Sequence, residues 1–427
     1  MSIERFGKTR YGNGDIVHVP FVRAGNWVFG SGLRATRANG LMDPAVLMSG
    51  RPLAAPPKAQ REAQHIFEGM AAQLAATGST LSRVARLDQY YPDPRSVDPY
   101  HVARKQALAG QVAPSTSIIV GGLLNCDAAM DVQVMAATTA SGYTIERVKA
   151  DLTAPQSSGY APCIRVGDMV FVAGQLARDA GGNIAAEAQP PAGQQWNGTR
   201  IKLETEYLFR KRLMPALEAA GSHPDLVLKA QVYLSHPEDL PAFLQTWAQC
   251  FGKRIPPTTI VPVAHPAFGT IDATIEVNLI AAHASASARV KDVACDVVLI
   301  AEGMLPACAF DGLLFVAGLM AIDKNGLAPS AQVQSNARYF HDSSRAQMTD
   351  ILTKANTIFA AAGSDLSQIV RALHFHTDLA GFHGAYMAWD ADLREAGLPF
   401  SAIGVADTMF VPGASVLLDL WGCAPGK

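Results

Sequence analysis

The sequence has no long hydrophobic run and no excess of charge of either sign. Its apolar runs are of strand length, such as 293–301 and 313–320, whereas a membrane-spanning helix needs about 20 apolar residues. The formal net charge is −2, with 35 Lys and Arg against 37 Asp and Glu, so the basic excess typical of nucleic-acid-binding proteins is missing. We therefore expect partners that are neither membranes nor nucleic acids.

Cysteine is also scarce, and the motifs that bind metals or cofactors are missing. The six cysteines include no C-x-x-C pair, and the eleven histidines include no H-E-x-x-H, which argues against a disulfide framework and a structural zinc site. The sequence contains no P-loop, dinucleotide fingerprint or G-x-S-x-G elbow. We expect no metal and no cofactor. The first residues show no signal-peptide pattern, so a cytoplasmic location is expected.

What the sequence does contain is one pattern that occurs three times. A hydrophobic strand ending in glycine reads GNWVFGSGL, then GDMVFVAGQL, then GLLFVAGLM, and its terminal glycines are Gly32, Gly174 and Gly318. The intervals between them are 142 and 144 residues. A fixed period of this kind indicates tandem copies of one folded unit.

Two further landmarks recur at the same period. A helix-ending Gly-Ser reads LAATGS, LEAAGS and FAAAGS, and a proline-containing turn leads into a strand as APSTSII, PPTTIVPV and LPFSAIGV. Three landmarks in one order with one period predict three repeats. We place them at residues 1–143, 158–284 and 298–427, with linkers at 144–157 and 284–297.

Each repeat shows the same order of elements, β-β-α-β-α-β-β. The first helix of the third repeat places Met348, Ile351, Ala355 and Phe359 on one face at the 3.6-residue period. In the second repeat Pro215 interrupts the corresponding helix and should kink it. The pattern predicts an α+β fold with helices on one face of each sheet. The other faces can be covered if the three sheets close around a common axis, as an intramolecular pseudo-trimer.

At these landmarks the chain resembles the reactive-intermediate deaminase family, also called the Rid or YjgF/UK114 family, whose fold is chorismate-mutase-like. The strand ending in Gly-Gln, the Ala-Gly at the helix end and the proline turn carry the resemblance. Family members are usually single units that form homotrimers with a ligand cleft at each interface. The resemblance implies that one chain here does the work of three, so we expect a monomer or homodimer.

The resemblance also implies an arginine after the proline turn, which grips a substrate carboxylate in a bidentate pair. That position falls on Thr116 in the first repeat, on Thr258 in the second and, with one residue of ambiguity, on Phe400 or Ser401 in the third. A hydroxyl cannot replace a bidentate guanidinium. The chain is therefore not expected to be a typical deaminase of amino-acid imines, and these hydroxyls would instead offer neutral hydrogen bonds to the substrate.

A second family position is a glutamate on the last strand that activates water. It falls on Asp131, Glu276 and Asp419, and the last two acids each lie 18 residues after Thr258 and Ser401. A buried carboxylate without a cation has a raised pKa, which suits a general base. The other interpretation is that these acids are edge-strand charges facing water.

The remaining family positions differ from repeat to repeat. A small polar residue of the opening strand is Ser31 in the first repeat, and Gln175 follows the second landmark glycine. A family tyrosine falls on His18, Tyr160 and Leu305. The second repeat thus keeps the fullest set of polar groups, and we expect the three pockets to be unequal.

Other candidates are weaker. Arg86, Lys229 and Arg371 recur at the repeat period and could line an anion pocket, form inter-repeat ion pairs or lie on a solvated face. His374 and His376 could suggest a metal site or be core histidines, and Cys163 could be a nucleophile or a buried thiol.

We expect a metal-independent hydrolase of a C–N bond in a small molecule, a deaminase or amide hydrolase. Water would be activated by Glu276, Asp419 or Asp131 in pockets between repeats. The alternative is a non-catalytic metabolite-binding protein. Burial decides between them, because acids at the base of a cleft support chemistry and acids in open solvent do not. A weaker rival is ribonuclease activity, against which the lack of a basic patch argues.

Overall fold

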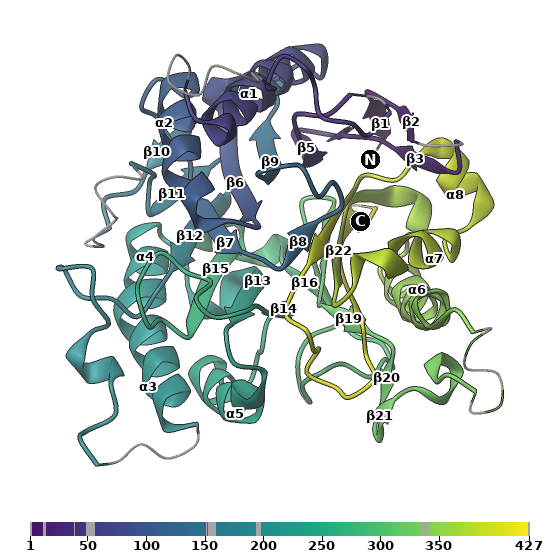
Figure 1. The fold of residues 1–427 in the computed structure, drawn as a ribbon. Coiled ribbons are helices and arrows are strands. Elements are labelled where there is room, and N and C mark those ends of the chain that lie inside the picture. The colour runs from purple at the N-terminus through teal and green to yellow at the C-terminus, as the bar shows by residue number, and fades with distance from the viewer. Residues whose placement is uncertain are drawn as a thin grey trace.

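The fold was analysed in a computed structural model of the chain. It describes residues 2–425 except 12–13, 38, 48–55, 151, 153–158, 194–197, 335, 337–338 and 340. The described residues form a mixed α+β structure of three large sheets and two small hairpins. Long helices lie on the outside of the molecule and the strands lie inside (Figure 1). No helix in this part of the chain is long and apolar enough to cross a membrane.

The first sheet has the strand order β1-β4-β5-β9-β6-β7. Its strands are β1 (Ile3–Phe6), β4 (Phe21–Ala24), β5 (Trp27–Leu33), β6 (Val84–Tyr91), β7 (Ser115–Ile119) and β9 (Asp131–Ala137). Helices α1 (Lys58–Ala76) and α2 (Val97–Ala107) accompany it, and β2 (Thr9–Tyr11) and β3 (Ile16–His18) form a hairpin.

The second sheet repeats this order as β10-β11-β12-β15-β13-β14. Its strands are β10 (Ile145–Arg147), β11 (Cys163–Val166), β12 (Met169–Gln175), β13 (Val227–Leu234), β14 (Thr258–Pro262) and β15 (Ile275–Ala282). The first helix runs as α3 (Thr199–Leu208), a π-helical turn at Phe209–Leu213 and α4 (Met214–Ala219), and α5 is Leu240–Phe251. The π turn lies directly before Pro215, where the sequence predicts a kink.

The third sheet follows the same order as β16-β17-β18-β24-β22-β23. Its strands are β16 (Lys291–Val293), β17 (Ala307–Phe310), β18 (Leu313–Val316), β22 (Ile369–His376), β23 (Phe400–Gly404) and β24 (Val416–Cys423). The short strand β8 (Gly122–Leu123) pairs with the edge strand β23, and β19 (Leu319–Met320) pairs with β24. A separate hairpin is formed by β20 (Ile322–Asp323) and β21 (Gly326–Leu327). Its helices are α6 (Ser343–Ala361), α7 (Phe382–Met387) and α8 (Ala391–Ala396).

Two segments expected as linkers contain sheet strands. Residues 145–147 form β10, the edge strand of the second sheet, and 291–293 form β16 at the same place in the third. Each sheet therefore opens with three strands before its first helix, where the sequence predicts two. The short polar strands Ile-Glu-Arg and Lys-Asp-Val carry little apolar alternation, so their pairing depends on the neighbouring strand. Residues 151 and 153–157 of the first expected linker lie outside the described residues.

The repeated Gly-Ser landmark ends a helix and ties it to a sheet. Gly78, Gly221 and Gly363 have φ of 79°, 69° and 70°, the left-handed C-cap conformation that glycine adopts without strain. The serine after each glycine donates its hydroxyl to the last strand of the same sheet, to the carbonyls of Ala137, Ala282 and Cys423 at 2.7, 2.6 and 2.5 Å. The landmark thus fixes the helix end against the sheet in all three copies.

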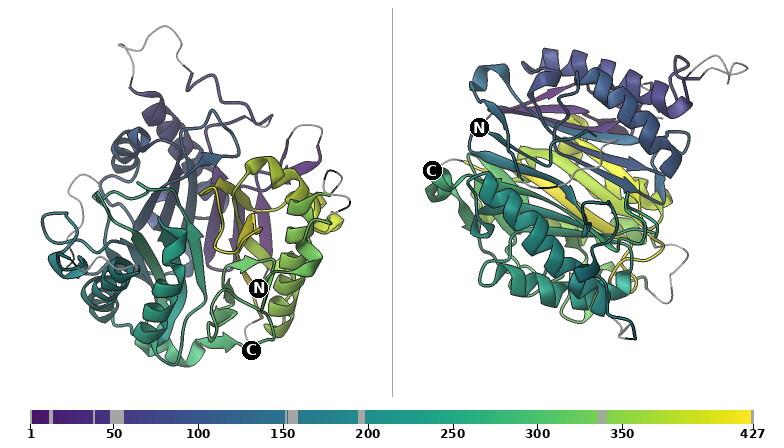
Figure 2. Two further views of the ribbon diagram at one scale, coloured as in Figure 1. Left: turned by 60° about the horizontal axis from the view of Figure 1, so that its bottom comes forward. Right: turned by 90° about the vertical axis from the view of Figure 1, so that its left-hand side faces the viewer.

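Contacts between the sheets follow one another in a cycle. Isolated bridges join Val112 to Tyr160, Ile255 to Met304 and Leu398 to His18. One apolar cluster takes side chains from all three sheets, among them Phe29, Phe171 and Trp421. One face of each sheet therefore packs against its helices, and the opposite face contacts the other two sheets. The two views of Figure 2 show the helices outside and the strands inside.

His374 and His376 are core residues of the third sheet. Both are fully buried, their rings stack at 5.9 Å, and no ring nitrogen of either has a hydrogen-bond partner among the described residues. Burial lowers the pKa of His376 to about 4 and that of His374 well below its usual value. No group of three or more potential metal ligands occurs in the described chain, so the core interpretation agrees with the geometry.

Replacing this pair should stabilise the protein in acid. The unfolded chain takes up protons near pH 6.5, while the folded pair does not until about pH 4 or below, so stability falls as the pH drops through this range. His374→Val with His376→Leu copies the residues at the same places in β13, Val232 and Leu234. We expect a gain of about 1–3 kcal/mol at pH 5, measured by urea unfolding. A gain that does not grow between pH 7 and pH 5 would contradict the assignment.

Candidate active site

A cavity of about 300 Å³ lies between elements of the first and second sheets. Its first-sheet side is formed by the start of α2 and by β7, and its second-sheet side by residues around β12 and the start of β15. Its polar lining residues are Asp98, His101, Ser115, Ser117, Tyr160, Arg178 and Glu276. The cavity thus brings together side chains that lie more than 150 positions apart in the sequence.

Glu276 lines this cavity and is 5% exposed. A Cβ atom at Gly174 would lie 1.9 Å from its Oε1 atom, so the landmark glycine of β12 leaves room for the carboxyl group. Burial raises the pKa of Glu276 to about 8; the charge of Arg178 opposes this rise and that of Asp88 adds to it. The carboxyl group is therefore suited to exchange a proton near neutral pH.

Tyr160 and Arg178 lie on the same side of the cavity as Glu276. Arg178 Nη2 donates to Tyr160 Oη at 3.1 Å. Burial raises the pKa of Tyr160, and Arg178 lowers it in part. The phenol consequently stays protonated at neutral pH and can donate its O–H to a bound molecule.

The opposite wall presents two hydroxyl groups and a neutral imidazole. Ser115 and Ser117 both donate to Gln89 Oε1, at 2.8 and 3.0 Å, and the buried Arg104 donates to Ser115 Oγ at 2.6 Å. Burial, together with Arg104 and Lys105, lowers the pKa of His101 to about 3. The wall offers neutral hydrogen-bonding groups held in place from behind.

The predicted residue Thr116 is absent from the lining of this cavity, as far as the structure describes the chain. Adjacent residues of a strand point to opposite faces, so Ser115 and Ser117 face the cavity while Thr116 accepts a hydrogen bond from Asn278 at 3.0 Å inside the molecule. In the strand register Thr116 matches Ser401 and Thr259, so Thr258 is the predicted residue that lies one position away from the other two. Arg178 and His101 were missed because they come from a loop and a helix outside the landmarks.

Asp131 meets the predicted residue Ser401 between the first and third sheets, while His18 lines a separate cavity of about 270 Å³ in the first repeat. Asp131 is fully buried, accepts from Arg34 at 3.0 Å and is hydrogen-bonded by Ser401. Burial raises its pKa to about 6 although Arg34 opposes the rise. His18 packs on Phe400 at 4.7 Å, and burial lowers its pKa to about 3.

Asp419 does not occupy the place of Asp131 and Glu276. Asp131 pairs with Tyr90 and Glu276 with Tyr233, but the matching partner in β22, Phe375, pairs with Leu417. The equal 18-residue intervals mislead because Thr258 matches Phe400 rather than Ser401 in register, and because the loop before the last strand is one residue shorter in the third sheet. Asp419 instead lies two positions further along its strand, in the buried network described next.

Three periodic cations form this central network together with Asp419. Arg371 and Lys229 each lie 2.7 Å from an Asp419 oxygen, and Arg86 binds Asp88 at 2.9 Å. Gln231 and Thr259 also donate to Asp419, both at 2.8 Å. All three cations are ion-paired in the interior: Lys229–Asp419 and Arg371–Asp88 join different repeats, whereas Arg86–Asp88 and Arg371–Asp419 each lie within one repeat.

Four other candidate residues lie in local hydrogen bonds or in buried surroundings. Thr258 donates to the Pro256 carbonyl at 2.8 Å, Gln175 accepts from Arg212 at 3.2 Å, and the buried Ser31 hydroxyl has no partner among the described residues. Cys163 is buried, and burial raises the pKa of its thiol to about 12, which removes the nucleophilic thiolate. Of the predicted site residues, Glu276 and Tyr160 meet at the cavity.

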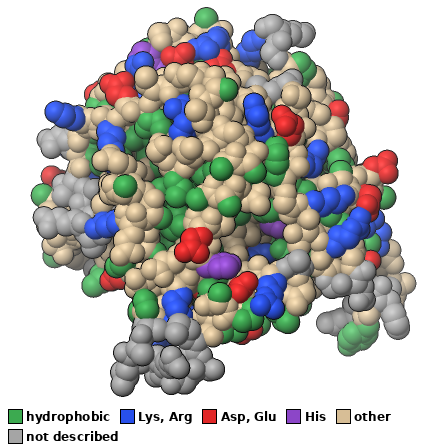
Figure 3. Space-filling view, turned by 90° about the horizontal axis from the view of Figure 1, so that it is seen from above, with side chains coloured by type: hydrophobic (Ala, Val, Ile, Leu, Met, Phe, Trp, Pro, Cys, Tyr) green, Lys and Arg blue, Asp and Glu red, His purple; other side chains and the backbone are tan. Residues whose placement is uncertain are grey.

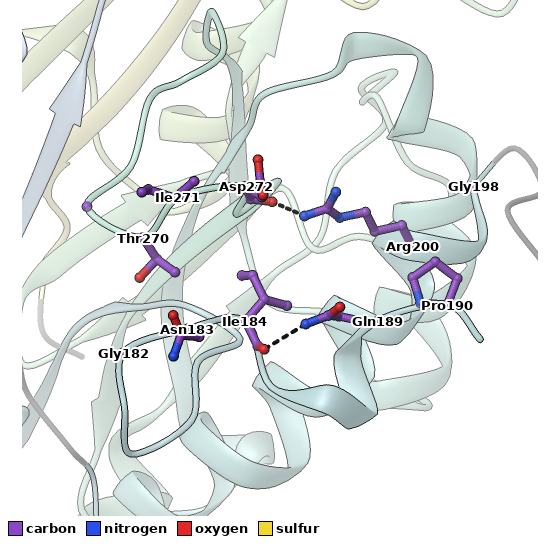
Figure 4. A pocket seen from close by; sticks show the side chains of 11 residues that line it. Gly182, Asn183, Ile184, Gln189, Pro190, Gly198, Arg200, Thr270, Ile271 and Asp272 are labelled. Atoms are coloured by element: carbon purple, nitrogen blue, oxygen red, sulfur yellow. Dashed lines mark hydrogen bonds between the residues drawn. The ribbon is translucent and has the colours of Figure 1, made fainter. Parts of the chain in front are cut away.

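A larger cavity of about 770 Å³ opens beside this one and shares Gly269 with it. Figure 4 shows two of its polar side chains bonded to the main chain: Arg200 is hydrogen-bonded to the carbonyl of Asp272, and Gln189 donates to the Ile184 carbonyl at 2.9 Å. The buried carboxyl group of Glu276 lies on the smaller cavity.

The face seen in Figure 3 carries Lys and Arg side chains interspersed with Asp and Glu. No continuous stripe of positive charge crosses it, in contrast to what binding a nucleic-acid backbone requires.

Comparison with known proteins agrees with the sequence pattern. Residues 152–283 match the family model described as Endoribonuclease L-PSP. The comparison with curated proteins finds no match. Among solved structures, yeast Mmf1 is 22% identical, with 33% of this chain and 99% of that chain covered and a TM-score of 0.26.

Two other solved structures are similar to parts of the chain. A putative endoribonuclease from Thermotoga maritima is 26% identical, with 32% of this chain and 94% of that chain covered and a TM-score of 0.25. A chorismatase is 15% identical, with 65% and 80% covered and a TM-score of 0.38. Over residues 152–283, the chain therefore carries a unit of the endoribonuclease L-PSP family, the YjgF/UK114 family that its repeated pattern resembles.

Proposed function

We propose that the chain is a metal-independent hydrolase that cleaves a C–N bond of a small molecule in the cavity between the first and second repeats. The observation that carries the proposal is the position of Glu276, a buried carboxyl group with a raised pKa that lines a cavity together with hydroxyl groups from another repeat. Acids in this position support chemistry rather than simple binding.

In the proposed reaction, Glu276 in its carboxylate form accepts a proton from a water molecule as the water oxygen attacks the carbon of a C=N bond. The C=N π electrons move to nitrogen, which is protonated by Tyr160 or by solvent. Glu276 then returns its proton to the nitrogen as the C–N bond breaks, and the hydroxyl proton passes to the Tyr160 phenolate or to solvent, which releases ammonia or an amine and leaves a carbonyl compound. Ser115 and Ser117 position the substrate through neutral hydrogen bonds.

We also propose that the three repeats form an intramolecular pseudo-trimer, with repeats at 1–143, 158–284 and 298–427, that is a monomer or homodimer in solution. The shared strand order, the cyclic bridges and the apolar cluster common to the three sheets support this arrangement. Its pockets are unequal because the place of Glu276 is taken by the ion-paired Asp131 in the first sheet and by Leu417 in the third.

Release of ammonia or amine from a panel of imines tests the proposed activity. We expect 2-aminoacrylate to be a poor substrate, because β7 lacks the arginine that would bind its carboxylate. Such a contact contributes about 2–5 kcal/mol, so its loss should lower kcat/KM on the order of 30-fold to several thousand-fold relative to imines of similar size without a carboxylate. Fast turnover of 2-aminoacrylate that Arg178→Gln abolishes would contradict this and assign the carboxylate to Arg178.

Gly174→Ala supplies a second test of the site. Its added Cβ would occupy the space of the Glu276 carboxyl group and should abolish turnover, whereas Gly69→Ala, on α1 with nothing within 4 Å of the added atom, is the control. Binding of substrates without any turnover in the wild-type protein would favour the alternative function, a metabolite-binding protein.

A further inference from the structure

The cavity of about 300 Å³ around Glu276 and the larger cavity of about 770 Å³ lie along the same two loops. The loop after β12 lines the smaller cavity at Arg178 and the larger one at residues 182–184. The loop before β15 lines the smaller cavity at residues 267–269 and the larger one at residues 269–272. Each loop thus continues from the wall of one cavity into the wall of the other.

The two cavities also meet directly. Arg178 of the smaller cavity and Ile184 of the larger one pair in an isolated antiparallel bridge, and the Cα atoms of such a pair lie about 5 Å apart. Gly269 lines both cavities and has no side chain that could divide them. A Cβ atom added to Gly269 would have nothing within 4 Å in the described structure, apart from its chain neighbours. The space beside Gly269 is therefore open.

The larger cavity offers neutral hydrogen-bonding groups and disfavours a negative charge. Figure 4 shows Asn183 and Thr270, an amide and a hydroxyl group, on the side of the cavity away from Arg200. The charge of Arg200 is already balanced, because its Nε atom donates to Glu204 at 2.9 Å. Asp272 adds a carboxylate to the lining that forms no ion pair with the described residues. An anionic group would be repelled there, whereas amide and hydroxyl groups fit.

We propose that the two cavities form one elongated binding site, and that the substrate is an uncharged molecule with its C–N bond beside Glu276 and an arm of amide or hydroxyl groups in the larger cavity. The apolar residues Leu176 and Phe268 of the smaller cavity would contact the part between them. The place of the reacting bond rests on the proposed function of Glu276. Gly269 is then a specificity-determining residue, because a side chain there would meet the arm between the cavities.

Calorimetric titration with oximes tests the proposal, because an oxime keeps the C=N bond and resists hydrolysis. Benzaldehyde oxime, which needs only the smaller cavity, should bind with a Kd on the order of 1 mM. The same oxime with an N-acetylglycylaminomethyl arm at the 4-position should bind at least tenfold more tightly. A succinylaminomethyl arm has a similar length but ends in a carboxylate, so it should lose this gain. Equal binding of the parent and the amide-armed oxime, binding of neither, or tightest binding of the carboxylate arm would overturn the proposal.

Two variants locate the arm. Gly269→Leu projects into open space from a residue whose φ lies outside the left-handed region, so it should fold and weaken binding of the amide-armed oxime at least tenfold. Thr270→Val removes only a hydroxyl group and should weaken that binding about threefold. Both variants should change the Kd of benzaldehyde oxime less than twofold. Gly69→Leu on α1, also directed into open space, is the control and should bind both oximes as the wild type does. Undiminished binding of the amide-armed oxime to Gly269→Leu would overturn the assignment.

These binding measurements separate the elongated site from the reaction. If the imine panel shows no turnover but the amide arm adds affinity that Gly269→Leu removes, the proposed function is wrong and the elongated site is supported. If imines are hydrolysed but the arm adds no affinity, the elongated site is wrong and the reaction at Glu276 is supported.

Discussion

Glu276→Gln should lower kcat/KM by about 10²- to 10⁴-fold, the usual size of a general-base contribution. The amide keeps the shape of the side chain beside Gly174 but cannot accept a proton from water. The measurement is single-turnover and steady-state kinetics on the best imine of the panel. Asp131→Asn, at the matching position of the first sheet, should affect turnover far less, because Asp131 faces Arg34 and Ser401 in a closed contact.

The pH dependence provides an independent check of the same role. A base acts in its deprotonated form, so kcat/KM of the wild-type protein should rise about tenfold per pH unit below an apparent pKa of about 8 and level off above it. The residual activity of Glu276→Gln should lack this rise. Full activity of the Gln variant, or a profile that falls between pH 6 and 8, would contradict a general-base role for Glu276.

The raised pKa of Glu276 also predicts how the stability of the Glu276→Gln variant compares with that of the wild type. The pKa of Glu276 is raised from 4.5 to about 8 in the folded protein, so the folded state retains a proton that the unfolded chain releases above pH 4.5. This carboxyl group therefore opposes folding increasingly from pH 4.5 to about 8. Glu276→Gln removes that penalty, and its unfolding midpoint at pH 8 should be equal to or above that of the wild type.

Asp419→Asn should be the most destabilising change in the central network, at about 3–5 kcal/mol. Arg86, Lys229 and Arg371 face only Asp88 and Asp419 there, so the variant leaves three cations with one carboxylate. Burial alone would raise the pKa of Asp419, but Lys229 and Arg371 outweigh burial and lower it to about 2. The stabilisation from this carboxylate is thus present above its ordinary pKa of 3.8 and is lost as the pH falls toward 2.

Urea unfolding of three variants separates charge balance from packing. Lys229→Met with Asp419→Asn restores one net positive charge in the network, as in the wild type, and should recover most of the lost stability. Asp93→Asn, at an exposed Arg95 pair, should leave the midpoint nearly unchanged. If Asp419→Asn unfolds at the wild-type midpoint, or the double variant is no more stable than Asp419→Asn alone, the network does not depend on this charge balance.

The sequence by itself determined the features that depend on local chemistry. Gly78, Gly221 and Gly363 end helices because only glycine takes the left-handed C-cap conformation easily, and the order of elements follows from apolar periodicity. The π-helical turn before Pro215 likewise agrees with the kink expected from the ring. Glu276 and Tyr160 could be predicted because each lies a fixed distance from a landmark in the best-preserved repeat.

Only the tertiary structure decided which side chains meet. A one-residue difference in register turns a strand side chain to the opposite face, which is why Ser115 and Ser117, and not Thr116, line the cavity. Equal sequence intervals placed Asp419 two positions from its structural match, because Thr258 and Ser401 differ by one position in register and the loops that follow them differ by one residue in length. Arg178 enters the site from a loop that carries none of the repeated landmarks. Its contact with the other site residues depends on how the sheets pack, which a local sequence pattern does not reveal.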